Sequence, residues 1–451
     1  MKIVVIGCGT IGKTVIKHVS KEGHSIIAID DDKKVIEELI EKFDILGIVG
    51  NGASLDIQEE ARTKDADLVV AVTSSDETNI LACLVAKRLG AKSTIARVRN
   101  PEYLRQTEIM KEDLGLTMIV NPEQETADEI VNLIDLPSLL KVEHFARGKV
   151  MLVEILVEEN SKLIDETLIT LAKKINTKFL ICAVQRGNEV IIPNGNFKIE
   201  KGDRISVTAD TQLIVELLKE MNLISEPLKN ILIIGGGKIA YYLAKTLISK
   251  KYKVKLIENN EERAVELAGS LPKATIICGD GTDHDLLVEE GIETTDSCIA
   301  LTNIDEENII ISMYAKKLKL PKVIAKIKRS SFLGMLNDLG IVNAVSPQDI
   351  VASKIVSYIR AISNKKGSNV LTLYKLVNNQ VEALEFHARK KERIYNKPLK
   401  DLKKKENCLI ACIIRDGDVI IPGGNDCIKL DDHVLVVTTH PNFDDLMDVF
   451  E

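Results

Sequence analysis

The chain has 451 residues, a net charge of −7 and 45% hydrophobic residues, the balance of a globular protein. The negative charge and the lack of a long Lys/Arg run argue against a nucleic-acid partner, and no apolar stretch approaches the ~18 residues of a membrane helix. Aromatic residues make up 4% and tryptophan is absent, so the cores must be built from Ile, Leu and Val, which suits parallel sheets buried on both faces.

The first part of the chain alternates short apolar runs with amphipathic segments. The runs are rich in β-branched residues and lie at about 2–6, 26–30, 45–49, 68–73, 94–98 and 118–120. Segments 33–43 and 77–89 carry apolar residues at helical spacing. This alternation predicts a doubly wound parallel sheet of the Rossmann type. The sequence begins directly with the first of these expected strands, so we expect no signal peptide.

A different pattern follows. An amphipathic helix is expected over 122–136, which could cross to a neighbouring subunit. After it, residues 143–226 predict a small mixed lobe: a strand (150–157), a helix (166–174), a hairpin (179–192, turning at 186–188), a strand (204–208) and a helix from 211. Residues 225–230 read as a linker.

The second half of the sequence repeats the first at a nearly constant offset of roughly 230 residues. Residues 2–9 match 230–237, Gly50-Asn51-Gly52 matches Gly279-Asp280-Gly281, and 190–193 match 419–422. We therefore predict an α/β protein with two Rossmann-like domains, each followed by a small α+β lobe. The expected boundaries are 1–121 (first nucleotide domain), 122–142 (crossover helix), 143–226 (first lobe), 227–345 (second nucleotide domain), 346–368 (crossover helix) and 369–451 (second lobe).

A glycine-rich motif follows the first strand and opens a helix, the context that dinucleotide binding requires. It consists of Gly7, Cys8, Gly9, Thr10, Ile11 and Gly12. The first glycine permits a tight turn, the second lets a pyrophosphate approach the backbone, and the third allows close helix–strand packing. Phosphates would bind at the helix N-terminus. The alternative is a glycine-rich turn without a ligand.

A carboxylate at the end of the second strand strengthens this interpretation. Asp30 can accept hydrogen bonds from the adenosine ribose hydroxyls and would repel a 2′-phosphate, so NAD is expected in preference to NADP.

Further candidates follow other strands at the same edge of the sheet. Gly50 and Gly52 are expected to allow positive φ, and Asn51 to bond adenine or ribose, although an ordinary turn is the alternative. Thr73 either contacts the ligand or, with Ser74, caps the next helix. Arg97 faces either a phosphate or a neighbouring subunit.

The second nucleotide domain has an altered set of the same residues. Ala240 replaces the third glycine, Glu258 replaces Asp30, and Lys326 stands at the Arg97 position. We expect it to bind NAD or another adenine nucleotide. The candidate residues are Gly235, Gly237, Lys238, Ile239, Glu258, Gly279, Asp280 and Thr302.

The sequence shows no Ser/Lys/Tyr set and no paired histidine and carboxylate beside these motifs, so no catalytic residue is assigned. The eight cysteines are scattered, mostly inside apolar runs, and are expected to be reduced, buried and structural. Neither they nor the seven histidines form a metal-ligand pattern. The run 403–405 is interpreted as solvated surface.

Taken together, residues 1–9, Asp30, Gly50-Asn51-Gly52, 73–79 and 96–101 resemble the TrkA family of potassium-uptake regulators, which are built from RCK (KTN) domains. The resemblance covers the whole chain, and the two lobes look like the TrkA-C lobes of that family. It departs at Ala240, Glu258, Lys326 and Ser330-Ser331.

The resemblance implies a cytoplasmic regulatory protein, not an enzyme, on the inner face of the cell membrane. It implies a TrkH/TrkG-like potassium-translocating partner, self-association into an RCK-domain ring, and gating by bound nucleotide. It also implies Gly7, Gly9, Gly12, Asp30, Asn51, Thr73 and Arg97 as the NAD(H) residues. The rivals are an NAD-dependent oxidoreductase and a nucleotide sensor of another cation transporter.

Overall fold

The computed structural model describes most of the chain. It covers residues 1–136, 138–145, 148–159, 161–187, 189–223, 228–329, 332, 335–336, 339–341, 343–363, 370–376, 381–389, 392–440, 443 and 445–451. Residues 225–227 of the predicted linker, Asn188 of the predicted hairpin turn, and Ser330-Ser331 lie outside the described residues.

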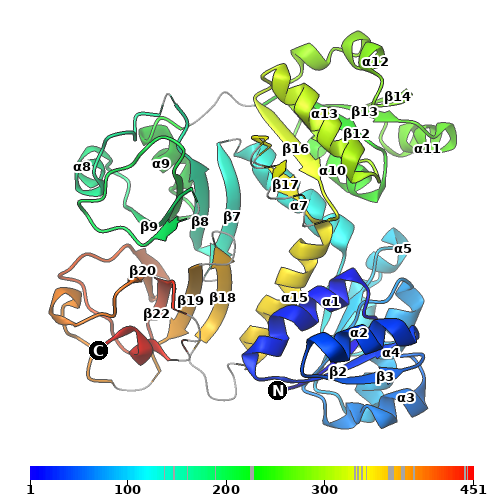
Figure 1. The fold of residues 1–451 in the computed structure, drawn as a ribbon, viewed down its shortest axis with the longest axis horizontal. Coiled ribbons are helices and arrows are strands. Elements are labelled where there is room, and N and C mark those ends of the chain that lie inside the picture. The colour runs from blue at the N-terminus through cyan, green and yellow to red at the C-terminus, as the bar shows by residue number, and fades with distance from the viewer. Residues whose placement is uncertain are drawn as a thin grey trace. The chain divides into compact units, whose positions relative to one another are not determined.

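The first nucleotide domain contains a six-stranded parallel sheet in the order β3-β2-β1-β4-β5-β6. Its strands are β1 (Lys2–Ile6), β2 (Ser25–Asp30), β3 (Leu46–Val49), β4 (Leu68–Ala71), β5 (Ser93–Arg97) and β6 (Met118–Val120). Its helices are α1 (Thr10–Val19), α2 (Lys33–Lys42), α3 (Leu55–Glu60), α4 (Asp76–Leu89), α5 (Pro101–Leu104) and α6 (Thr107–Glu112). Figure 1 shows this domain in blue.

The core of this domain follows from the apolar runs that predicted it. Every residue of β4 is buried, as are four of the five residues of β1, because helices pack on both faces of a parallel sheet. Helix α1 buries Ile11, Val15 and Val19, which recur every four residues and so share one face.

The second nucleotide domain repeats this topology, with the strand order β14-β13-β12-β15-β16-β17. Its strands are β12 (Asn230–Ile234), β13 (Lys253–Glu258), β14 (Thr275–Cys278), β15 (Ser297–Ala300), β16 (Lys322–Lys326) and β17 (Ala344–Val345). The helices described between them are α10 (Lys238–Ser249), α11 (Glu261–Ser270), α12 (His284–Glu289) and α13 (Asp305–Lys317).

Each lobe is built on an antiparallel sheet of five strands, ordered β10-β9-β11-β8-β7 and β18-β19-β22-β20-β21. The first lobe contains β7 (Leu139–Phe145), β8 (Val150–Leu156), α8 (Leu168–Lys174), β9 (Phe179–Arg186), β10 (Glu189–Ile191), β11 (Arg204–Asp210) and α9 (Ile214–Glu220). The second contains β18 (Val370–Leu376), β19 (Val381–His387), η6 (Leu399–Asp401), β20 (Cys408–Arg415), β21 (Asp418–Ile420), β22 (His433–Thr438) and η7 (Leu446–Val449).

Two long helices leave the nucleotide domains, α7 (Pro122–Asp135) and α15 (Pro347–Ser363). By internal contacts the chain forms two units, one of residues 1–131 with 228–359 and the other of 132–227 with 360–451. The two nucleotide domains therefore share one unit and the two lobes share the other.

The predicted fold is confirmed: two doubly wound parallel-sheet domains, each followed by an α+β lobe. Strand β7 was not predicted, because its alternating polar residues do not form an apolar run. In the described part of the chain no helix is both long and apolar enough to cross a membrane. The exact domain boundaries stay a prediction.

Candidate functional site

The three glycines of the first loop occupy three different environments. Gly7 has φ +87°, and a Cβ there would lie 2.6 Å from the backbone N of Thr73. A Cβ on Gly12 would lie 2.1 Å from the carbonyl oxygen of Gly7. A Cβ on Gly9 would meet nothing within 4 Å. The protein itself therefore requires Gly7 and Gly12, whereas the space above Gly9 is open to a ligand at the N-terminus of α1.

The second loop has the same arrangement. Gly235 has φ +98° and its Cβ would lie 2.8 Å from the N of Thr302, while a Cβ on Gly237 would again meet nothing within 4 Å. Ala240, which replaces the third glycine of the motif, is fully buried. Both loops thus leave open space at the residue where a pyrophosphate approaches the backbone.

A carboxylate braces each loop from the end of the second strand. Asp30 Oδ2 accepts a hydrogen bond from Cys8 N at 2.6 Å, and its Oδ1 accepts one from Asp32 N at 3.0 Å. Glu258 accepts equivalent bonds from Gly236 N (2.6 Å) and Asn260 N (2.8 Å). Carboxylate oxygens have further lone pairs, so both can still accept from ribose hydroxyls.

The longer glutamate is matched by a smaller residue in the loop. A Cβ on Gly236 would lie 2.8 Å from Glu258 Oε2 and 2.6 Å from Leu267 Cδ1. The first loop has Cys8 at this place, fully buried and beside the shorter Asp30. Burial raises the pKa of the Cys8 thiol to about 12, so it stays protonated and acts as packing.

The expectation that Gly50 and Gly52 adopt positive φ is wrong. Neither residue has a positive φ. Glycine is required at both positions because neighbouring side chains leave no room for a Cβ. A Cβ on Gly50 would lie 2.5 Å from Ile57 Cδ1, and one on Gly52 would lie 2.1 Å from Ile6 Cγ2. The turn is therefore pressed against β1 and α3.

The side chains of the turn differ between the two domains. Asn51 Oδ1 accepts from Ala53 N at 3.0 Å, and the exposed Asn51 keeps its amide N–H groups for a ligand. Asp280 accepts from both the backbone N and the hydroxyl of Thr282, and these bonds lower its pKa. The first site thus offers donors where the second offers only acceptors.

Sequence reasoning missed the residue that organises the loop after β4. Asn79 is fully buried, its Oδ1 accepts from Thr73 N (2.8 Å), and its Nδ2 donates to the carbonyls of Thr73 (3.2 Å) and Arg97 (2.9 Å). Asn308 makes the same three bonds, to Thr302 and Lys326. The internal repeat could have revealed this residue, because asparagine occupies the corresponding position in both halves.

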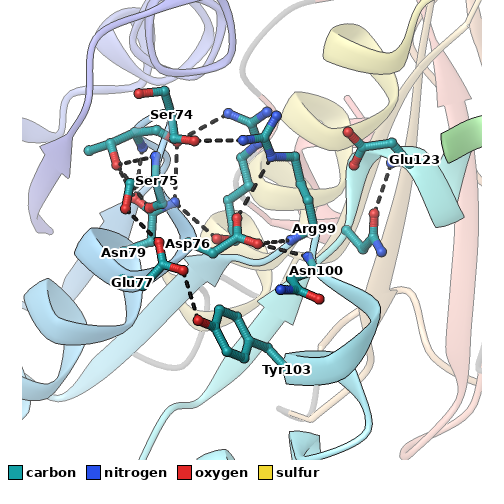
Figure 2. Close-up of polar contacts among 12 residues, drawn as sticks. Ser74, Ser75, Asp76, Glu77, Asn79, Arg99, Asn100, Tyr103 and Glu123 are labelled. Carbon is teal, nitrogen blue, oxygen red and sulfur yellow. Dashed lines mark hydrogen bonds and ion pairs between the residues drawn. The ribbon is translucent and has the colours of Figure 1, made fainter. Parts of the chain in front are cut away.

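The alternatives for Thr73 and its neighbours are partly decided. Ser75, not Thr73 or Ser74, caps α4 by accepting from Thr78 N at 3.1 Å. Thr73 Oγ1 lies 2.7 Å from Asn79 Oδ1 within the loop. Figure 2 shows Asp76 below Ser75, accepting from the backbone N of Arg99 (2.8 Å) and of Asn100 (2.7 Å). Asp76 therefore holds the loop that follows β5.

A cation stands at the end of the fifth strand in each domain. Arg97 donates from Nη1 to the Thr73 carbonyl at 3.1 Å, and Lys326 Nζ donates to the Leu301 carbonyl at 3.0 Å. Burial lowers the pKa of Arg97 and, more strongly, that of Lys326 to about 8, with the charges of Arg99 and Lys328 acting in the same direction. Whether Arg97 faces a phosphate or a neighbouring subunit stays a prediction.

The remaining candidates divide by burial. Thr10 and Lys238 are exposed at the first turns of α1 and α10, whereas Ile11 and Ile239 are buried and offer a ligand only their backbone amides. The structure brings Gly7, Thr73 and Asp30 to one edge of the sheet through the contacts above. That these residues bind a nucleotide stays a prediction.

Each site presents groups of the kind that dinucleotide binding requires in this fold. Gly9 and Gly237 are the N-cap residues of α1 and α10 and receive no side-chain cap, and a carboxylate stands at the end of the second strand, where the ribose diol binds in this fold. Among the described residues no group of three His, Cys, Asp or Glu side chains could hold a metal ion. The cysteines are free and mostly buried as predicted, except the exposed Cys278 and the half-buried Cys427.

Comparison with known proteins identifies both kinds of domain. The TrkA-N domain model matches residues 3–122 and 231–347, and the TrkA-C domain model matches 152–222 and 385–451. Among solved structures, the GsuK channel has a TM-score of 0.65 at 17% identity, over 97% of this chain and 76% of that one. The GsuK channel bound to NAD has a TM-score of 0.64 with the same identity and coverage. At such identity the likeness concerns the fold alone.

Full-length relatives agree with the domain models. The chain is 34% identical over 445 residues to Trk system potassium uptake protein TrkA homolog 1 of Methanosarcina mazei, covering 97% of both chains. It is 31% identical to the TrkA homolog of Archaeoglobus fulgidus over 451 residues, 100% of both. It is 32% identical to the TrkA of Vibrio alginolyticus, covering 98% of this chain and 97% of that one. The chain therefore belongs to the TrkA family of Trk system potassium uptake proteins.

Proposed function

We propose that this chain is the NAD(H)-binding regulatory subunit of a Trk-type potassium uptake system and that it gates a membrane potassium-translocating subunit without catalysing a reaction. The observation that carries the proposal is the open space above Gly9, with Asp30 bonded to the same loop. The neighbouring glycines are required by contacts within the protein, but Gly9 is not. An unoccupied approach to a helix N-terminus is what a pyrophosphate needs.

The residues of the first site have separate tasks in this proposal. The amides at the start of α1 bind the pyrophosphate, Asp30 accepts from the adenosine ribose, and Asn51 donates to adenine or ribose. Arg97 and Asn79 hold the Thr73 loop against Gly7. A nucleotide bound there shifts a conformational equilibrium only by its differential affinity for the two states.

The second domain differs in ways that favour a separate nucleotide preference. Asp280 can only accept hydrogen bonds, Glu258 fills space beside Gly236, and Lys238 adds a positive charge at the loop. We propose that it binds NAD or another adenine nucleotide. In support, the solved structures of similar fold include GsuK bound to NAD and GsuK bound to ADP.

Membership of the family also supports a proposal for the partner and the location. The relatives are named as potassium uptake proteins of the Trk system, which supports a TrkH/TrkG-like translocating subunit as partner and a cytoplasmic place at the inner face of the membrane. Self-association into an RCK-domain ring is part of the same proposal, as is the assignment of no catalytic residue.

The test is potassium uptake in cells lacking the gene, complemented with wild type, Asp30→Ala or Glu258→Ala at equal protein levels. We expect wild type to restore uptake, and Asp30→Ala to change it while NADH affinity falls. Glu258→Ala is the matched substitution that reports on the second domain. If deletion leaves uptake intact when other potassium systems are also removed, the assignment is wrong.

Steady NADH turnover with a small substrate would then favour an oxidoreductase, and altered flux of another cation would favour a sensor of a different transporter.

A further inference from the structure

The two lobes carry ion pairs at equivalent places in their sheets. In the first lobe, Arg204 of β11 forms an ion pair with Glu154 of β8, with Nη1 3.7 Å from Oε1. In the second lobe the same strand positions hold His433 of β22 and Glu385 of β19, and His433 Nδ1 lies 2.8 Å from Glu385 Oε1. The first lobe therefore has a permanently charged cation where the second has a side chain that gains or loses a proton near neutral pH.

A second histidine stands beside the pair in the second lobe. His387 is the register partner of His433 in the ladder between β19 and β22, two neighbouring strands in Figure 1. The two rings stack with their centroids 4.6 Å apart and 26° between their planes. Arg389 Nε donates to His387 Nδ1 at 2.6 Å, so this ring nitrogen carries no proton. In the first lobe the register partner of Arg204 is Leu156, so no second ring is present there.

Few other charged groups face the two rings among the side chains that the structure describes. Asp431, in the turn before β22, places Oδ1 3.7 Å from His387 Nε2. On β20, the register partner of His433 is the uncharged Ile414. These side chains do not form a metal site, because no group of three His, Cys, Asp or Glu side chains in the described part of the chain could hold an ion.

The rings lie on the face by which the second lobe packs against the first. Side chains alternate along a strand, so Leu435 shares the face of His433, and Leu435 belongs to one apolar cluster with Cys182 of the first lobe. The thiols of Cys182 and Cys412 in this cluster stay protonated near neutral pH, because burial raises their pKa to about 12. The first lobe also contributes the charge of Asp210, which acts on Cys412.

The two rings accept a proton with different consequences. A proton on His433 Nδ1 is donated to the carboxylate of Glu385, which is 4% exposed, so it strengthens the pair. A proton on His387 Nδ1 breaks the bond from Arg389 and stacks one cationic ring on another.

The sign of the pH dependence follows from His387. Burial lowers its pKa, His433 and Arg389 act in the same direction, and the opposing charges of Asp431 and Glu385 do not reverse it. Below the ordinary histidine pKa of about 6.5, the unfolded chain therefore binds a proton that the folded lobe does not. The folded lobe then loses stability as the pH falls.

We propose that His387 and His433 form a pH switch in the second lobe, in which acidification opens the strand pair β19–β22 at the end that carries the two rings. The equivalent strands of the first lobe do not respond, because Arg204 and Leu156 stand there in place of the histidines. Since the rings lie on the face shared by the lobes, opening this end changes how the second lobe packs against the first. The switch goes beyond the proposed function and requires no bound nucleotide.

The experiment measures exchange of backbone amide hydrogens in the full chain, expressed as protection relative to an unstructured peptide at the same pH. Peptides covering 381–389 report on the second lobe, and peptides covering 150–157 report on the equivalent strand of the first. Between about pH 7.5 and about pH 5.5 we expect protection of 381–389 to fall by about three- to tenfold, because one unit of pKa shift corresponds to tenfold. Protection of 150–157 should stay constant.

The variants replace the histidines with the residues of the first lobe. His387→Leu together with His433→Arg is expected to abolish the pH response of 381–389, and His387→Leu alone should do the same, which covers the case that the double variant does not fold. The matched control is His440→Gln. His440 lies in the same lobe but bonds the Glu406 carbonyl through Nε2, so this substitution should preserve the response.

Three outcomes overturn the inference. If protection of 381–389 changes no more than that of 150–157, the second lobe has no switch. If the response survives both His387→Leu and the double variant, another group carries it. If His440→Gln removes the response as well, the effect is not specific to the stacked pair.

Discussion

At the residue scale, the same amino acid is present for different reasons within one short loop. Gly7 and Gly12 are glycine because Thr73 and the Gly7 carbonyl leave no room for a Cβ. Gly9 differs, because a Cβ at this position would meet no other atom of the protein within 4 Å. We propose that the group which requires a glycine here is the pyrophosphate of the nucleotide, because in this fold a pyrophosphate approaches the backbone at the second glycine of the loop.

This difference leads to a paired prediction. Gly12→Ala should lower the free energy of unfolding by about 2 kcal/mol through overpacking. Gly9→Asp should leave it within about 0.5 kcal/mol, because its backbone (φ −66°, ψ −162°) suits an N-cap aspartate. It should nevertheless weaken NADH binding more than about tenfold, since like charges ~4 Å apart repel by several kcal/mol in a partly buried site.

Urea unfolding and NADH titration of the two variants check this. Equal loss of stability in both would contradict the separation of roles. Unchanged NADH affinity in folded Gly9→Asp would mean that the open space is not the binding site.

At the scale of elements, helix α4 and the loop after β5 are held together by one carboxylate. Asp76 accepts two backbone N–H bonds from that loop, and Asp305 does the same for Lys328 N (3.0 Å) and Arg329 N (2.9 Å). Both aspartates are buried. Because the two halves share this arrangement, we infer that it fixes the position of the loop after the fifth strand in each nucleotide domain.

Asp76→Ala should therefore lower the free energy of unfolding by about 2–3 kcal/mol, because two partly buried backbone N–H donors lose a charged acceptor. The matched control is Glu102→Ala, an exposed carboxylate near the same loop, which should change it by less than about 0.5 kcal/mol. Chemical denaturation of both variants measures the difference. A stable Asp76→Ala protein would show that the loop is held by other contacts.

At the scale of the whole molecule, the duplication lets the two lobes complete one another. A single apolar cluster combines buried residues of the first lobe, among them Leu152, Cys182 and Ala183, with Ala411 and Leu435 of the second. Each lobe therefore covers an apolar face of the other, and an isolated half would expose it.

We expect a half chain of residues 1–227 to form a homodimer, in which a second copy of the first lobe replaces the second lobe. Light scattering after size exclusion would measure its mass, and circular dichroism would verify that it is folded. Ala183→Asp in the same half chain, which places a charge in the fully buried cluster, should keep it monomeric. A folded, monomeric half chain without that substitution would contradict the prediction.

Several site residues were predictable because their cause is local in sequence. The glycine loop, Asp30 and their counterparts follow from a motif at fixed distances from a strand, and the repeat shows them twice. Asn79 was within reach of the same comparison, since Asn308 repeats it. The expectation for Gly50 and Gly52 was wrong because a glycine alone does not reveal whether φ or packing requires it, and here Ile57 and Ile6 decide.

The amino-acid sequence by itself determined the duplication, the two parallel sheets and the glycine-rich loops, because periodic burial and turn chemistry act over a few residues. Only the tertiary structure decided that a Cβ on Gly9 would meet no atom within 4 Å, that Glu258 is accommodated by Gly236, and that Asn79 joins the loop at Thr73 to the end of β5 at Arg97. These depend on distances between side chains far apart in the chain, where a displacement of about one ångström turns a contact into a clash or a gap.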